Sequence, residues 1–72
     1  MVGEEFPIGI MVFTRRTQMG LSQYKLAERA GISRGHLIAI EQGKAKDLKM
    51  STVNKLANAL GIHPAAFLNQ NR

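Results

Sequence analysis

The sequence has no cysteine and no tryptophan, and its 72 residues include only two prolines, two histidines and five acidic side chains. Without cysteine, the chain forms no disulfide and no cysteine-ligated metal site. A metal site needs three or four converging ligands, and His36 and His63 are far apart in the sequence, so we expect no bound metal. No apolar run approaches the roughly 20 residues of a membrane span, and the acidic start of the chain is unlike a signal peptide. We therefore expect a cytoplasmic protein without membrane contact.

The residue groups that support catalysis are also missing. No two of the carboxylates have neighbours that suggest acid–base chemistry; they are Glu4, Glu5, Glu28, Glu41 and Asp47. Ser22 and Ser33 precede expected helices, so we interpret them as helix caps rather than nucleophiles. There is no glycine-rich phosphate loop. We therefore expect neither an enzyme nor a cofactor.

What the sequence does have is an excess of positive charge. The formal net charge is +5, and eight of the ten Lys and Arg residues lie between Arg15 and Lys49. A basic excess on a small helical domain indicates a polyanionic partner, most simply nucleic acid. Basic surfaces also aid solubility, so charge alone does not decide the function.

The distribution of apolar residues favours an all-α fold of five helices in one domain spanning residues 1–72. Alternation of β-branched residues is absent, and Val53, Leu56, Ala57 and Leu60 follow the i, i+3, i+4, i+7 spacing of an amphipathic helix. The expected helices run from residue 7 or 8 to 18, from 23 to 30, from 34 to 42, from a start between 50 and 52 to 60, and from 64 to 68. We expect residues 1–6 and 69–72 to be flexible.

The most informative pattern is a pair of short helices in residues 22–42. Gly31 stands where the first helix must end, because glycine takes the left-handed conformation at low cost. Ser33 can cap the second helix, which Leu37 and Ile40 would anchor to the core. Two helices joined by such a turn form the arrangement that places a helix in the DNA major groove. The alternative is a helical hairpin that binds no ligand.

If Leu37 and Ile40 point inward, other residues of this second helix must point outward. They are Arg34, Gly35, Ile38 and Ala39, with His36 at the edge.

The segment RRTQMGLSQYKLAERAGISRGHLIAIEQGKAK resembles the lambdoid phage repressor and Cro-type (XRE-like) helix-turn-helix family. The matching residues are Arg16, Gly20 to Gln23, Leu26, Ala27, Ala30 to Ser33, Leu37, Ile40, Glu41, Gly43 and Lys44. LANALGI followed by AAFL is similar to the family's ending, so that the resemblance covers nearly all of residues 8–68. It implies a five-helix lambda-repressor-like domain that binds operator DNA as a two-fold dimer.

The resemblance also implies roles for individual residues. Those expected to face base edges are Arg34, Gly35, Ile38 and Ala39. Arg34 is the strongest candidate, because its guanidinium fork matches guanine O6 and N7. Those expected near DNA phosphates are Gln23, Ser33, His36, Gln42, Lys44, Lys46 and Lys49. Arg16 and Glu41 match a pair that ties the first helix to the end of the third.

The sequence departs from the family pattern at two places. Gly35 stands at a base-reading position without a side chain, which either lets the backbone approach closely or forfeits a contact. The Pro-Ser often found before the fourth helix is replaced by Leu48 and Lys49, so that Asp47 or Ser51 would have to cap that helix.

Some apolar residues allow more than one interpretation. Ile10 and Phe13 point away from the expected core face of the first helix, and Phe6 would join them if the helix reached it. Two interpretations remain open: these residues contact a second subunit or another protein, or the N-terminal segment folds back and covers them. The last helix often contributes to dimers in similar proteins, which makes Phe67 a further candidate. We expect core filling from Met11, Met19 and Met50.

Together these observations predict a sequence-specific regulator of transcription that binds double-stranded DNA, acting as a repressor on a palindromic operator. A homodimer would meet half-sites roughly 34 Å apart. The expected helices occupy most of the chain, so we expect no separate effector domain. The alternative is a protein-interaction module, such as an antitoxin or adaptor, in which DNA binding is secondary.

Overall fold

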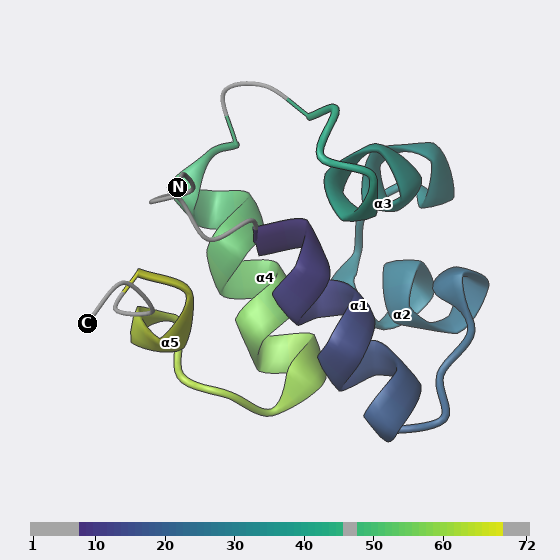
Figure 1. The fold of residues 1–72 in the computed structure, drawn as a ribbon, viewed down its shortest axis with the longest axis horizontal. Coiled ribbons are helices and arrows are strands. Elements are labelled where there is room, and N and C mark those ends of the chain that lie inside the picture. The colour runs from purple at the N-terminus through teal and green to yellow at the C-terminus, as the bar shows by residue number, and fades with distance from the viewer. Residues whose placement is uncertain (1–7, 46–47, 69–72) are drawn as a thin grey trace.

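The computed structural model describes residues 8–45 and 48–68, and these residues form five helices and no strand. The helices are α1 (Ile8–Gln18), α2 (Gln23–Ala30), α3 (Arg34–Glu41), α4 (Met50–Leu60) and α5 (Ala65–Leu68) (Figure 1). This confirms the predicted all-α, five-helix architecture. The bounds differ from the prediction by a residue at most, as at α3, where Gln42 follows the helix as its C-cap. The terminal segments predicted to be flexible lie outside the described residues.

The helices of the central pair begin and end at the residues whose chemistry predicts it. The Ser22 hydroxyl accepts a hydrogen bond from the Lys25 amide at 3.0 Å, and the Ser33 hydroxyl accepts one from the His36 amide at 3.0 Å. Gly31 ends α2 with φ +77°, in the left-handed region that glycine adopts without strain. The start of each helix and the end of α2 are therefore defined by interactions within one turn.

One buried cluster joins all five helices. In Figure 1, α1 and α4 cross the middle of the domain, with α2 and α3 at one end and α5 at the other. The cluster takes Val12 from α1, three residues from α2 and two from α3, and Phe67 from α5. The predicted stripe of α4 is buried throughout, and each large side chain contributes about 1.5–3 kcal/mol through burial. The full set is Val12, Leu26, Ala27, Ala30, Leu37, Ile40, Val53, Leu56, Ala57, Ala59, Leu60 and Phe67.

Helices α1 and α3 approach closely at Gly9. Gly9 is buried, and a Cβ atom at this position would overlap the Ile40 carbonyl oxygen and lie 2.9 Å from the Glu41 carbonyl oxygen. The first turn of α1 therefore rests directly on the carboxyl end of α3. No other residue type fits without displacing one of the two helices.

Three expectations need correction. Phe67 is 1% exposed, because α5 folds its ring into the core, so that it offers no surface for self-association. Met50 is 49% exposed, because it is the first residue of α4 and lies where the helix leaves the core; Met11 and Met19, in contrast, pack partly buried against the core. The N-cap of α4 is Lys49, without a side-chain capping bond. Ser51 lies inside the helix, and Asp47 lies outside the described residues.

Candidate nucleic-acid interface

The second helix of the central pair has one buried side and one accessible side. Leu37 and Ile40 are 0% and 3% exposed and hold α3 against the core. Among the residues predicted to point outward, Arg34, Gly35 and His36 are exposed. Ile38 and Ala39 are half-buried. This division follows from the helical period, because residues three and four apart share a side. Of the four residues predicted to face bases, Arg34 and Gly35 are therefore exposed, whereas Ile38 and Ala39 are half-buried.

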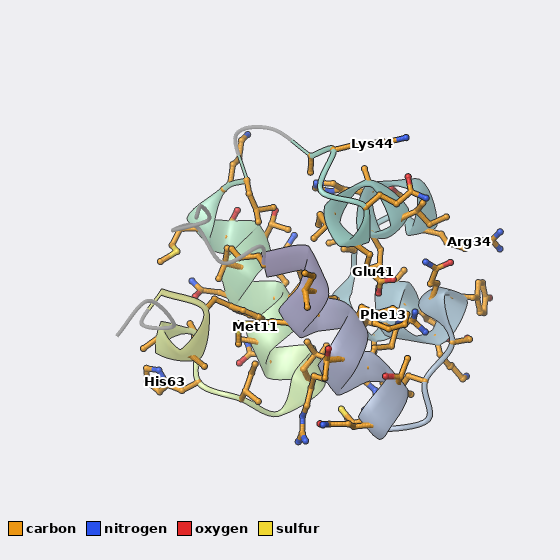
Figure 2. All side chains as sticks on the ribbon, viewed as in Figure 1. Met11, Phe13, Arg34, Glu41, Lys44 and His63 are labelled. Carbon is orange, nitrogen blue, oxygen red and sulfur yellow. The ribbon has the colours of Figure 1, made fainter. Side chains whose placement is uncertain are left out.

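Cationic side chains lie at both ends of this surface. Figure 2 shows Arg34, at the first residue of α3, and Lys44, three residues after its end, extending away from the body of the domain. Both residues are exposed, and so are Gln42 and Lys49. Ser33 is exposed as well, and its hydroxyl oxygen accepts the capping bond, which leaves its proton available to a second acceptor. Lys46 lies outside the described residues.

A buried polar network stands behind this surface, centred on Glu41. Arg16 donates from Nε to Glu41 Oε2 at 2.7 Å and from Nη2 to Glu41 Oε1 at 3.1 Å. Its third donor, Nη1, bonds the Leu21 carbonyl oxygen at 2.8 Å. One guanidinium group therefore connects α1 to both the end of α3 and the turn that precedes α2. The two side chains are 10% and 5% exposed, so that water screens the pair little.

Gln23 joins the same network, which sequence reasoning missed. Its Nε2 donates to Glu41 Oε1 at 3.1 Å, although the prediction was a phosphate contact alone. An amide NH2 group has two protons, so that the second remains available to an acceptor outside the protein. The two residues are 18 positions apart, and no local pattern in the sequence pairs them.

Tyr24, the neighbour of Gln23, was also not singled out from the sequence. It is 61% exposed at the second residue of α2, on the end of the domain that carries α2 and α3. The sequence alone did not predict this exposure. The spacing of Tyr24 from the buried Leu26 and Ala27 does not show whether its side chain lies at the edge of the core or in solvent.

The face of α1 away from the core has two apolar side chains that are about half exposed. Ile10 and Phe13 are 51% and 50% exposed, as the helical spacing predicts. The Phe13 ring has a local partner, because the Arg16 guanidinium carbon lies 5.3 Å from its centroid. Phe6 lies outside the described residues. On the next turn of α1, Arg15 donates from Nε to the Leu60 carbonyl oxygen at 3.1 Å, which ties α1 to the end of α4.

In the part of the chain that the structure describes, no group of three or more His, Cys, Asp or Glu residues is placed to hold a metal ion. Among those same residues, no helix has both the length and the apolar character needed to cross a membrane.

Comparison with known proteins identifies the family. A family model described as helix-turn-helix matches residues 13–67, which is more than half of the chain. The chain belongs to the XRE-type helix-turn-helix family. This confirms the resemblance found in the sequence, and this XRE-type chain is a transcriptional regulator with a helix-turn-helix DNA-binding domain. Proteins of this kind are typically not enzymes.

Two relatives extend the assignment. The chain is 35% identical over 51 residues to an uncharacterised HTH-type transcriptional regulator of Methanothermobacter thermautotrophicus, covering 71% of this chain and 72% of the relative. It is 33% identical over 61 residues to YozG of Bacillus subtilis, also an uncharacterised HTH-type transcriptional regulator. This match covers 85% of the present chain and 70% of YozG.

Solved structures agree with the fold. SinR, a master regulator for biofilm formation solved in complex with DNA, superposes with a TM-score of 0.81 at 26% identity, covering 86% of this XRE-type chain and 98% of that chain. A SinR–SinI protein complex matches with a TM-score of 0.83 at 25% identity, covering 90% of this chain and 63% of that one.

Proposed function

We propose that this XRE-type regulator binds a specific double-stranded operator by placing α3 in the major groove, and that it represses transcription from that site. The observation that carries the proposal is the two-sided character of α3. Leu37 and Ile40 fix the helix to the core, while Arg34 and its outward neighbours stay accessible. A helix held rigidly on one side and free on the other is what major-groove reading requires.

Base recognition is assigned to the outward residues of α3. Arg34 reads guanine, because its fork donates to O6 and N7 together. Ile38 and Ala39 pack against thymine methyl groups. A Cβ atom added to Gly35 would meet no atom of another segment within 4 Å, so that the chain there has open space on its outer side. The lack of a side chain at Gly35 lets the DNA approach the backbone closely.

Phosphate contacts supply the sequence-independent part of the affinity. The basic residues assigned to phosphate contacts are Lys44, Lys46 and Lys49, and the polar ones are Gln23, Ser33, His36 and Gln42.

Gln23 donates two hydrogen bonds in this arrangement. One amide proton holds Glu41 and the other bonds a phosphate oxygen, so that backbone contact with DNA is coupled to the network that positions the end of α3.

The regulator acts as a dimer on a palindromic site. A two-fold dimer presents two copies of α3, and half-sites one helical turn apart, roughly 34 Å, match that arrangement. SinR, a fold relative at 26% identity, has been solved in complex with DNA, which supports the use of this domain on a duplex. A regulator of this kind acts in the cytoplasm, associated with the nucleoid through its DNA.

The experiment that tests the proposal is a binding selection from a random duplex library at moderate salt. We expect enrichment of a short inverted repeat, and we expect Arg34→Ala to change which sequences are enriched. Salt-sensitive binding without enrichment would contradict sequence-specific recognition, since phosphate contacts alone produce that result.

A second function is favoured by the apolar face of α1. An antitoxin or adaptor would use Ile10 and Phe13, each about half exposed, to contact another protein or a second subunit. The SinR fold also occurs in a complex with a protein, SinI. Phe13→Ser discriminates the two functions: an unchanged oligomeric mass and unchanged operator affinity would remove the α1 face from consideration.

A further inference from the structure

Three residues of α3 form a stripe without a polar side chain. Gly35, Ile38 and Ala39 follow the i, i+3, i+4 spacing that places residues on one side of a helix. Gly35 is exposed, and a Cβ atom added to it would meet no atom of another segment within 4 Å. Ile38 and Ala39 are half-buried, so that part of their surface stays accessible. These three residues are named the outer stripe of α3.

The two apolar side chains of the outer stripe do not belong to the core. Partly buried apolar residues pack against the buried cluster on either side of α3, as Ile32 and Ala45 do. Among the described residues, that set includes neither Ile38 nor Ala39. Leu37 and Ile40 make the core contacts of α3 instead. The accessible surface of Ile38 and Ala39 is therefore free to contact another molecule.

The outer stripe also has no acceptor to offer a DNA base. Its side chains contain no oxygen or nitrogen. The carbonyl oxygens of its apolar residues are already bonded, that of Ile38 to the Gln42 amide at 3.0 Å and that of Ala39 to the Lys44 amide at 2.8 Å. A base that faces the stripe can therefore be recognised there by its apolar atoms only.

The carboxylate of α3 does not supply the missing acceptor. Glu41 is the single acidic residue of this helix, and a carboxylate is the usual partner of the cytosine N4 amino group. Both of its oxygens accept from Arg16, and one accepts from Gln23 as well. Its side chain is 5% exposed, so that a base cannot reach it. Cytosine N4 thus finds no acidic partner on α3.

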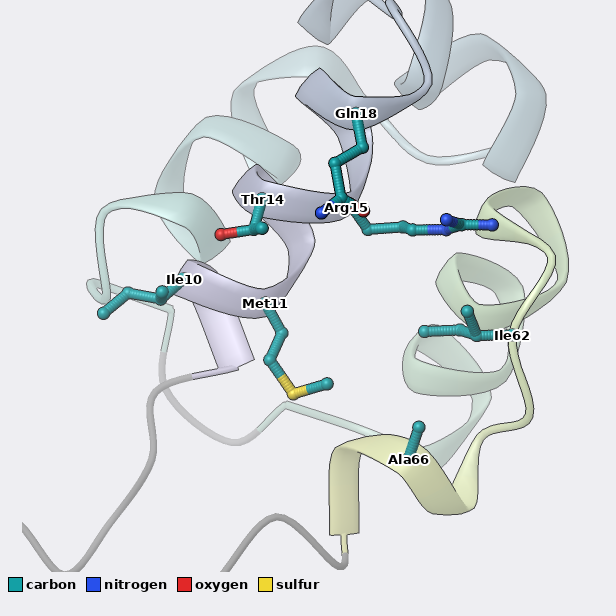
Figure 3. Close-up of a pocket in the computed structure, with 7 residues that line it drawn as sticks. All are labelled: Ile10, Met11, Thr14, Arg15, Gln18, Ile62 and Ala66. Atoms are coloured by element: carbon teal, nitrogen blue, oxygen red, sulfur yellow. The ribbon is translucent and has the colours of Figure 1, made fainter.

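The position of the outer stripe sets it apart from other accessible apolar surface. A groove of about 290 Å³ lies between α1 and the segment that leads into α5, where Met11 faces Ile62 and Ala66 (Figure 3). That groove lies toward the α5 end of the domain, opposite α2 and α3 (Figure 1). The stripe instead lies in the chain between Arg34 and Lys44, whose cationic side chains extend from the domain (Figure 2). Charge complementarity therefore brings a DNA duplex to the stripe.

We propose that the outer stripe reads the C5 methyl group of a pyrimidine without distinguishing thymine from 5-methylcytosine, so that cytosine methylation changes which sites the regulator binds. This inference rests on the proposed placement of α3 in the major groove. There, thymine presents O4 beside its methyl group, whereas cytosine presents N4. The methyl group of 5-methylcytosine is attached to the same ring carbon. Because Ile38 and Ala39 bond neither O4 nor N4, the methyl group alone decides their contact.

A selection from three random duplex libraries tests the inference with the full chain. One library contains the natural bases, one has uracil in place of thymine, and one has 5-methylcytosine in place of cytosine. We expect the natural library to enrich a site with a fixed thymine in each half. The preference at that position should disappear in the uracil library. In the methylated library, the same position should accept thymine and 5-methylcytosine equally.

Affinities for synthetic duplexes of the enriched site measure the contact. Replacing thymine by uracil in one half-site should weaken binding roughly fourfold, the effect expected of one buried methyl group. Replacing cytosine by 5-methylcytosine at the same position should strengthen binding by the same factor. Both ratios should approach one in Ile38→Ser. The matched control is Ile10→Ser, which changes an accessible isoleucine on α1 and should leave both ratios unchanged.

The possible failures are distinguishable. An enriched site that has no fixed thymine, that keeps its preference in the uracil library or that rejects 5-methylcytosine overturns methyl reading and leaves the operator proposal standing. Ratios that stay fourfold in Ile38→Ser also overturn it, because another residue then reads the methyl group. Absence of enrichment from every library contradicts the operator proposal itself, and methyl reading fails with it.

Discussion

Arg16 and Glu41, 25 positions apart in the sequence, form a bidentate ion pair. Arg16 Nε lies 2.7 Å from Glu41 Oε2, and Arg16 Nη2 lies 3.1 Å from Glu41 Oε1. The pair links the middle of α1 to the last residue of α3. Because Gln23 also donates to this carboxylate, three of the five helices meet at one buried side chain. The orientation of α3, on which the proposed base reading depends, is held at this point.

Removing the carboxylate should cost much more than breaking a surface pair. We expect Glu41→Ala to lower the free energy of unfolding by roughly 3–5 kcal/mol, because it leaves a buried guanidinium without its partner. The matched control is Glu28→Ala, which breaks an exposed pair with Lys25 at 3.5 Å and should cost about 0–1 kcal/mol. Urea denaturation measures both, and similar losses for the two variants would contradict a central role for Glu41.

Two glycines should respond oppositely to alanine. Gly9→Ala places a methyl group on the Ile40 carbonyl oxygen, and we expect a loss of roughly 1–3 kcal/mol from overpacking. Gly35→Ala has open space and a helical backbone, so it should stabilise the domain by about 0.5–1 kcal/mol. Thermal and urea unfolding compare the pair; if Gly9→Ala were as stable as the native chain, the close approach of α1 to α3 would be wrong.

A capping serine should stabilise α4. Lys49 is its N-cap residue, with extended backbone but no capping hydrogen bond from its side chain. Lys49→Ser should add about 1 kcal/mol, because a hydroxyl can accept from an unpaired amide of the first turn. The reciprocal variant Ser33→Ala removes an existing cap from α3 and should cost a similar amount, about 1 kcal/mol. Urea unfolding should move in opposite directions for these two variants, and a shift of the same sign would refute the assignment of the caps.

Base and phosphate contacts should separate in mutant binding data. Arg34→Ala should cost roughly 1–3 kcal/mol against the selected operator and relax the preference at one base pair. Lys44→Ala should weaken all sequences alike and reduce the salt slope by about one. Titrations of both variants against the operator and a scrambled duplex, at several salt concentrations, provide the comparison. Equal, sequence-independent losses for both variants would remove Arg34 from the base-reading set.

Much of the local structure was predictable because its causes lie within a few residues of one another. Ser22 and Gly31 define the two ends of α2, and Ser33 defines the start of α3, through bonds to amides and carbonyls of the adjacent turn. The apolar spacing of α4 likewise predicts its buried side. The same short-range pattern identifies the outward residues of α3 and carries the family resemblance.

Other features depended on which helices meet. Gly9 reads as an ordinary helix residue until its backbone lies against Ile40, and Gln23 reads as a surface residue until the fold brings Glu41 to it. Phe67 and Met50 are both apolar residues near helix ends, yet one is 1% and the other 49% exposed. By itself, the sequence determined the helices, the central pair of helices and the family, since these follow from interactions within a turn or two. Only the tertiary structure decided the Glu41 network, the α1–α3 contact and the groove beside α5, because these depend on contacts between residues distant in the chain, whose partners no local period specifies.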